Sequence, residues 1–192
     1  MKSLLTRLVT LAACALLANC ANGVIARTNS AQASASDIAR DSRSALDGLF
    51  RTHPKARSLA ARSRAVLVFP KVTKAGLMVG GMGGNGTLFL RGGGVGGFYQ
   101  TAGLSYGLQA GAQQYGYALF LMNDQAVANL NRDGGWDIGS APSIVVIDQG
   151  MAGSLTMESL NQNAYALFFS QKGLMAGLGL QGTKITRIHP RN

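Results

Sequence analysis

Acidic residues, histidine, cysteine and tryptophan are all scarce in this chain of 192 residues, which has 8 Asp and Glu, 2 His, 2 Cys and 1 Trp. Both cysteines, Cys14 and Cys20, lie in the first twenty residues, so the rest of the chain can hold neither a disulfide framework nor a Cys-based zinc site. Among the few acids after Asp47, Asp133 and Asp137 are four residues apart, but the glycines between them predict a turn rather than a helix face. No G-x-S-x-G nucleophile elbow occurs. The sequence therefore predicts no catalytic residues, no metal site and no cofactor, and it indicates a protein that is not an enzyme.

Positive charge is abundant by contrast, with 18 Lys and Arg and a net charge of +10. The hydrophobic content of 47% excludes a disordered polar tail, and the length is that of a single domain. No acid occurs between Gly48 and Asn123. This imbalance favours an anionic partner such as nucleic acid, a lipid surface or an acidic polymer. Seven cations fall within 24 residues of that stretch: Arg51, Lys55, Arg57, Arg62, Arg64, Lys71 and Lys74.

The amino terminus has the pattern of an export signal. Lys2 and Arg7 form a positive region, and eleven mostly apolar residues without charge follow over 8–18. This run is shorter than the roughly 20 residues of a membrane-spanning helix. The tetrad Leu17-Ala18-Asn19-Cys20 comes next and resembles the lipobox of bacterial lipoproteins. The resemblance implies a signal peptide over 1–19 and a lipid, palmitate among its acyl chains, on Cys20.

Two further inferences depend on this processing. Ala21 stands where an Asp would resemble an inner-membrane retention signal, so the resemblance implies an exported protein anchored at the outer membrane. Residues 20–35 are small and polar and are expected to form a flexible tether before a single domain over 36–192. An ordinary signal peptide, with Cys20 as an incidental thiol, is the alternative.

The domain is predicted to begin with helices and to continue as a sheet. Apolar residues recur every three or four positions from Ile38 to Phe50, after a helix start at Ser36-Asp37, and Pro54 should interrupt the helix. A second short helix is expected over 56–64, and a third over 125–130. Strands are expected at Val66–Phe69, Thr87–Leu90, Tyr117–Leu121, Ser143–Asp148, Ser154–Glu158, Ala164–Ser170, Leu174–Gln181 and Lys184–Ile188. The predicted fold class is α+β, with N-terminal helices packed on a glycine-rich, mainly antiparallel β-sheet or incomplete barrel.

Two glycine runs, Gly81–Gly86 and Gly92–Gly97, fit the pattern G-x-G-x-x-G. A dinucleotide site would need a helix to open at the last glycine, but a strand-like segment follows each run. We therefore expect hairpin turns or close sheet packing at these glycines. A nucleic-acid partner is not expected either, because Phe50 and Phe69 are the only aromatic residues near the basic cluster and both look core-facing.

Several motifs follow one another between Ala39 and Ile188. They are Ala65-Val66-Leu67-Val68-Phe69-Pro70-Lys71-Val72-Thr73-Lys74-Ala75-Gly76, then Gly80-Gly81 with Gly84-Asn85-Gly86-Thr87-Leu88, Ser105-Tyr106-Gly107-Leu108-Gln109-Ala110-Gly111, and Tyr165-Ala166-Leu167-Phe168-Phe169-Ser170-Gln171-Lys172-Gly173-Leu174-Met175-Ala176-Gly177, closed by Leu180-Gln181-Gly182. In this order they resemble the SYLF domain family, in its branch of exported bacterial lipoproteins. The resemblance implies a lipid-binding domain, which in the eukaryotic, actin-associated members uses an N-terminal amphipathic helix and basic residues. Actin binding is not expected here, because export removes that partner.

The resemblance and the charge pattern together predict a lipid-binding domain that contacts an anionic phospholipid membrane. Each Lys or Arg near an anionic surface contributes about 1 kcal/mol, so a cluster could hold the domain at a membrane. The alternative is a structural or surface-interaction lipoprotein that binds acidic glycans or another envelope protein. The expected headgroup contacts are Arg57, Arg62, Arg64, Lys71 and Lys74.

Overall fold

A computed structural model describes residues 33–138, 144–147, 162–173 and 182–192. Residues 31–192 form one compact unit. The predicted signal peptide over 1–19, Cys20 and most of the predicted tether lie outside the described residues. The strands predicted at 154–158 and 174–181 also lie outside them.

The described chain opens with two helices, as the sequence predicts. Helix α2 spans Ala35–Thr52 and buries Ile38, Ser42, Leu46 and Leu49, which form the expected apolar stripe. Its N-cap is Ser34 rather than the predicted Ser36: the Asp37 backbone N–H donates to Ser34 Oγ at 3.1 Å. The cap therefore lies within the segment expected to be a tether, two residues before the predicted start of the domain.

Pro54 separates α2 from the next helix, because the residue before a proline is kept out of the helical region. Helix α3 spans Pro54–Arg62, with the proline in its first turn, where it can occur without loss of a helical hydrogen bond. Ala56 and Leu59 are its buried residues. Helix α3 therefore turns a narrow apolar face inward and leaves its cationic residues on the surface.

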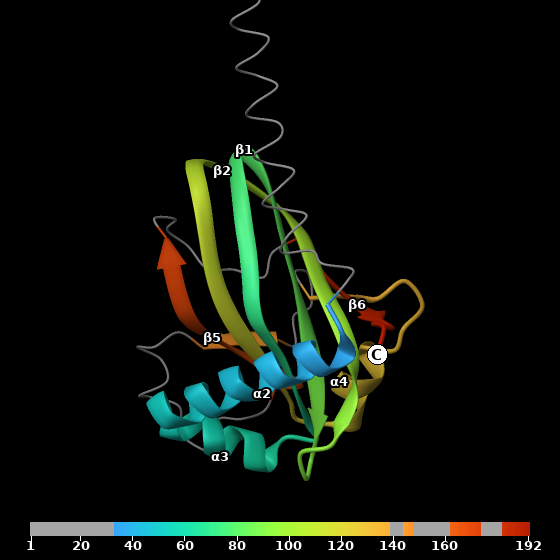
Figure 1. Ribbon diagram of the computed structural model, residues 1–192. Coiled ribbons are helices and arrows are strands. Elements are labelled where there is room, and N and C mark those ends of the chain that lie inside the picture. Colours follow the sequence, from blue (N-terminus) through green and yellow to red (C-terminus); the bar gives the residue numbers. More distant parts are fainter. Residues whose placement is uncertain (1–32, 139–143, 148–161, 174–181) are drawn as a thin grey trace, which may run out of the picture. The chain divides into compact units, whose positions relative to one another are not determined.

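Two very long strands form the centre of the sheet. Strand β1 spans Ala65–Leu90 and β2 spans Val95–Leu121, and they pair as one antiparallel hairpin. Both strands double back: in Figure 1 each rises to a bend and returns. The ladder shifts register between Gly76 and Met78, at this bend. We expected several short strands between glycine turns; the backbone instead runs through these glycines as continuous strand.

The glycines permit the doubling back because they lack a side chain where the two halves of β1 meet. A Cβ atom on Gly84 would overlap the carbonyl oxygen of Lys71, and one on Gly86 would lie 2.7 Å from Phe69 Cδ1. The second glycine run contains the hairpin turn, in which Gly92 and Gly93 have φ of +95° and +88°. Such values favour glycine. Of the two expected uses of these glycines, the first run shows close sheet packing and the second run shows a hairpin turn.

The remaining elements complete one mainly antiparallel sheet. Helix α4 spans Asp124–Asn129, close to the predicted 125–130, and is capped by the side chain of Asn123. Strand β5 pairs antiparallel with β2 and parallel with β4, while β6 joins β2 to β3. The α+β class and the incomplete barrel are confirmed. The four shorter strands are β3 (Trp136–Asp137), β4 (Ile144–Ile147), β5 (Ala164–Gly173) and β6 (Thr183–Ile188).

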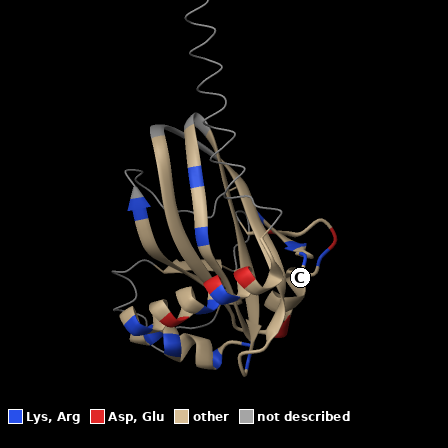
Figure 2. Cartoon of the chain, in the orientation of Figure 1, with Lys and Arg blue, Asp and Glu red and all other residues tan. Residues whose placement is uncertain are grey.

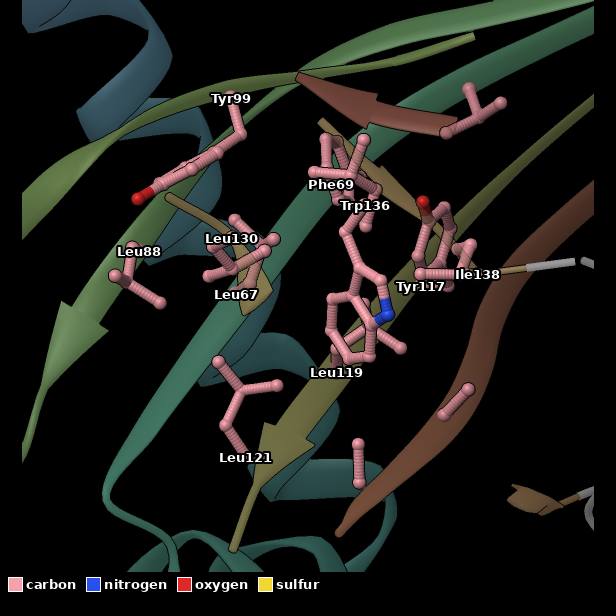
Figure 3. Close-up of a cluster of buried hydrophobic side chains, with 14 of the residues drawn as sticks. Leu67, Phe69, Leu88, Tyr99, Tyr117, Leu119, Leu121, Leu130, Trp136 and Ile138 are labelled. Atoms are coloured by element: carbon pink, nitrogen blue, oxygen red, sulfur yellow. The ribbon is translucent and has the colours of Figure 1, made fainter. Parts of the chain in front are cut away.

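Alternating residues of the sheet build two hydrophobic clusters. The first lies on the concave side and includes Leu67, Phe69, Tyr117 and Trp136 (Figure 3). The Phe69 and Tyr117 rings stack with centroids 4.8 Å apart. The second lies on the opposite face, where residues such as Val68 meet α2 and α3. In the described ranges, no helix combines the length and the apolar character needed to cross a bilayer.

Candidate functional site

The two helices differ in their content of charged residues. The sequence of α2 contains three acids and three arginines. Arg40 Nη2 lies 2.7 Å from a carboxylate oxygen of Asp37. A hydrogen bond from Ser34, together with Arg40, lowers the pKa of Asp37 below its ordinary value. Helix α3 contains cations and no acid of its own, so the excess of positive charge along the sequence begins where α3 begins.

Helix α3, the residues after it and the β1–β2 turn meet at one end of the sheet. Arg91, in that turn, donates from Nε to the Ser63 carbonyl at 3.2 Å and from Nη2 to the Arg62 carbonyl at 3.1 Å. Its backbone N–H donates to the Arg64 carbonyl at 3.1 Å. These bonds satisfy carbonyls that the end of a helix leaves without partners. The turn is thereby fastened to the C-terminal end of α3.

We call this region the basic end and define it by five exposed cations. Three are on α3, one follows the helix, and one is in the hairpin turn. Figure 2 shows Lys and Arg gathered on α3 and at the turn, whereas α2 carries both signs of charge. The five residues are Lys55, Arg57, Arg62, Arg64 and Arg91.

Arg57 and Arg64 of the basic end each contact another side chain. The Arg57 guanidinium carbon lies 5.5 Å from the centroid of the Phe50 ring, which leaves the cation exposed on an aromatic support. Arg64 Nε lies 3.4 Å from Asp124 Oδ1, and the two side chains are 54% and 86% exposed. Exposed pairs of this kind contribute about 0–1 kcal/mol, so Asp124 compensates the charge of Arg64 only weakly.

The five cations predicted as headgroup contacts divide into two sets. Arg57, Arg62 and Arg64 are in the basic end. Lys71, which is exposed, and Lys74, which is half-buried, lie farther along β1. Ten residues separate Arg64 from Lys74, or roughly 30 Å at the rise of a strand. The structure brings the arginines together and leaves the two lysines apart from them.

Arg91 belongs to the basic end but was not among the predicted residues. It stands beside the second glycine run, which we interpreted only as a turn. The sequence does show a cation, Arg91, directly before the three glycines of the turn, but it does not indicate which helix that turn contacts. In the described part of the chain, no three His, Cys, Asp or Glu side chains come together in a way that could hold a metal ion.

Residues 102–192 match the family model named Ysc84, described as Las17-binding protein actin regulator. No curated protein matches the chain. The matched residues begin within β2 and include α4 and strands β3 to β6. The basic end lies wholly before Ala102, so the match assigns nothing to its five cations.

Proposed function

Residues 102–192 belong to the SYLF domain family, a family of lipid-binding domains, and from this premise we propose that the chain binds anionic phospholipid headgroups through its basic end. The domain acts without catalysis in this proposal. The observation that carries it is the meeting of five exposed cations at α3 and the β1–β2 turn, within a stretch that has no acid between Gly48 and Asn123.

The expected strength follows from the number of cations. At about 1 kcal/mol for each cation near an anionic surface, the basic end supplies at most roughly 5 kcal/mol. Screening within about 10 Å at 0.1 M salt reduces this value. Binding by the domain alone is thus expected to be reversible and to weaken steeply with added salt.

A permanent attachment requires a second element, and we propose acyl chains on Cys20 for that role. The support is the Leu17-Ala18-Asn19-Cys20 sequence after an apolar run. Acyl chains contribute about 0.8 kcal/mol for each buried CH₂, and stable anchoring takes two signals, such as lipid and a basic surface. In this proposal the protein is exported and held at the outer membrane. A Cys20→Ser variant should then leave the membrane fraction at high salt, and a variant that stays bound would contradict the anchor.

Flotation of residues 31–192 with vesicles tests the headgroup proposal. This fragment retains the Ser34 cap and the bond from the Ala35 N–H to the Arg191 carbonyl. Both hydrophobic clusters lie within it, between Leu46 and Ile185. It should float with vesicles that contain anionic lipid and remain below with neutral vesicles. Binding to a soluble acidic glycan, without flotation, would instead favour the surface-interaction alternative.

Charge-matched variants locate the binding surface. Changing Arg57, Arg62 and Arg64 together to Gln should weaken binding to anionic vesicles and flatten its salt dependence. The control removes three exposed cations elsewhere, by changing Arg132, Lys172 and Lys184 to Gln. If both triple variants lose the same affinity, net charge alone attracts the domain and the basic end is not the site. A third variant, with Lys71 and Lys74 changed to Gln, tests the two predicted contacts that lie apart.

A further inference from the structure

Large hydrophobic side chains are exposed at the β1–β2 turn. Among the described residues, the exposed large hydrophobic side chains are Leu90, Val95 and Leu104, with exposed fractions of 45%, 49% and 60%. Leu90 and Val95 flank the turn on its two sides, and we call residues 90–95 the hairpin tip. Single exposed hydrophobic residues are ordinary on a soluble domain. Two of them on one turn require an explanation.

The hairpin tip has a defined conformation. The Leu90 N–H donates to the Gly94 carbonyl at 2.8 Å, and the Gly93 N–H donates to the Leu90 carbonyl at 2.8 Å. A Cβ atom on Gly96 would lie 2.8 Å from Leu90 Cδ2, so this glycine leaves room for the Leu90 side chain beside the β2 backbone. The tip therefore presents its apolar side chains on an ordered turn.

The tip is also fixed beside the cations of the basic end. Arg91, the second residue of the tip, binds the carbonyls of Arg62, Ser63 and Arg64 as described above. Arg43 of α2 also donates a hydrogen bond to the Gly93 carbonyl. The Arg43 guanidinium carbon lies 4.0 Å from the centroid of the Phe89 ring. Figure 1 shows the β1–β2 turn beside α3 at one end of the sheet. The exposed apolar side chains of the tip and the arginines of the basic end therefore belong to the same end of the domain.

We propose that the hairpin tip inserts into the interface of an anionic bilayer, with Leu90 and Val95 entering the acyl boundary while the arginines contact headgroups. The inference rests on the proposed function and identifies the element that penetrates. Apolar side chains gain free energy on leaving water, and interfacial elements bury their apolar face about 5–10 Å into the headgroup and acyl boundary. The three glycines of the turn add no side chain that would oppose shallow entry. The adjacent positive charge makes the occupant an anionic lipid surface.

Tryptophan placed at the tip tests this directly. The full chain with Leu90→Trp is mixed with vesicles of anionic lipid that carry bromine on the upper acyl chain. The added tryptophan should shift its emission to shorter wavelength and lose most of that emission by quenching. Leu104→Trp is the matched control, since Leu104 lies nine residues along β2 from Val95, or roughly 30 Å. Its emission should stay unquenched, as should that of buried Trp136.

Val95→Trp provides a second probe if Leu90→Trp fails to fold, and it should be quenched likewise. Equal quenching at positions 90, 95 and 104 would mean general adsorption and would overturn the proposal. An emission shift without vesicles, together with dimer formation, would identify a second copy as the occupant and would also overturn it. If residues 31–192 float with anionic vesicles but neither tip probe is quenched, the insertion is wrong while the proposed function stands. If flotation fails as well, both are wrong.

Discussion

Replacing Gly86 by alanine is expected to destabilise the domain, because the returning half of β1 packs closely against the first half of the strand at this glycine. The added Cβ atom would overlap the carbonyl oxygen of Val68 and would lie 2.7 Å from Phe69 Cδ1. The Phe69 ring cannot swing away easily, since its side chain is fully buried and stacks on Tyr117. The Val68 carbonyl is held as well, because it accepts a hydrogen bond from Ser42 Oγ at 3.3 Å. The strands themselves would have to separate.

The size of this destabilisation can be estimated from how far the neighbouring strand must move. Carbon atoms in contact prefer about 3.5–4.0 Å, so the neighbouring strand would have to move by roughly 1 Å. Overpacking a core usually lowers the free energy of unfolding by about 1–3 kcal/mol. Because the added methyl group meets backbone atoms, which cannot move aside alone, we expect a loss of about 3 kcal/mol for Gly86→Ala. For a domain of this size the melting temperature should fall by roughly 6–12 °C. Gly84→Ala, whose Cβ would overlap the Lys71 carbonyl oxygen, should behave alike.

Gly81→Ala is the matched control in the same strand. Gly81 is exposed, and a Cβ atom there would meet nothing within 4 Å. Alanine also restricts the unfolded chain, so this variant should be neutral or more stable by up to about 1 kcal/mol. Urea unfolding followed by the fluorescence of buried Trp136 measures all three variants. If Gly86→Ala unfolds at the same urea concentration as Gly81→Ala, the two halves of β1 do not pack on each other and the doubled hairpin is wrong.

Three further outcomes are expected from the described contacts. Arg91→Ala should lower the free energy of unfolding by about 1–2 kcal/mol, because the carbonyls of Arg62 and Ser63 lose a charged donor. Lys184→Ala is the control, and equal stability of the two variants in urea would show that these bonds contribute nothing. Burial raises the pKa of Tyr115 and Tyr117, so these tyrosines ionise at lower pH in the unfolded chain than in the folded one. The free energy of unfolding should therefore fall as the pH rises above about 10. In the variant with both tyrosines changed to Phe, the free energy of unfolding, measured over the same pH range, should fall less. Ser34→Ala should lower the free energy of unfolding by about 1 kcal/mol through loss of the α2 cap, whereas Ser36→Ala should change it little. If Ser36→Ala lowers the melting temperature more than Ser34→Ala does, Ser36 is the N-cap, as the sequence predicted.

The sequence by itself determined the helices of this protein. The apolar periodicity from Ile38 to Phe50 predicted the buried face of α2, and Pro54 predicted the break before α3. The helix predicted over 125–130 corresponds to α4. These signals act over a few residues, through side-chain direction, capping hydrogen bonds and the fixed φ of proline. For that reason they can be recognised without knowledge of the rest of the chain.

Only the tertiary structure decided how the glycine runs are used and which cations meet. A glycine next to an apolar residue permits both a turn and a close approach of two strands, and Gly84 and Gly92 show that the chain uses each. Arg64 and Lys74 are near in sequence but are separated by an extended strand. Arg91 joins Arg62 because the hairpin returns its tip to α3. Contacts between distant segments follow from the packing of the whole sheet and its helices, and no local pattern specifies them.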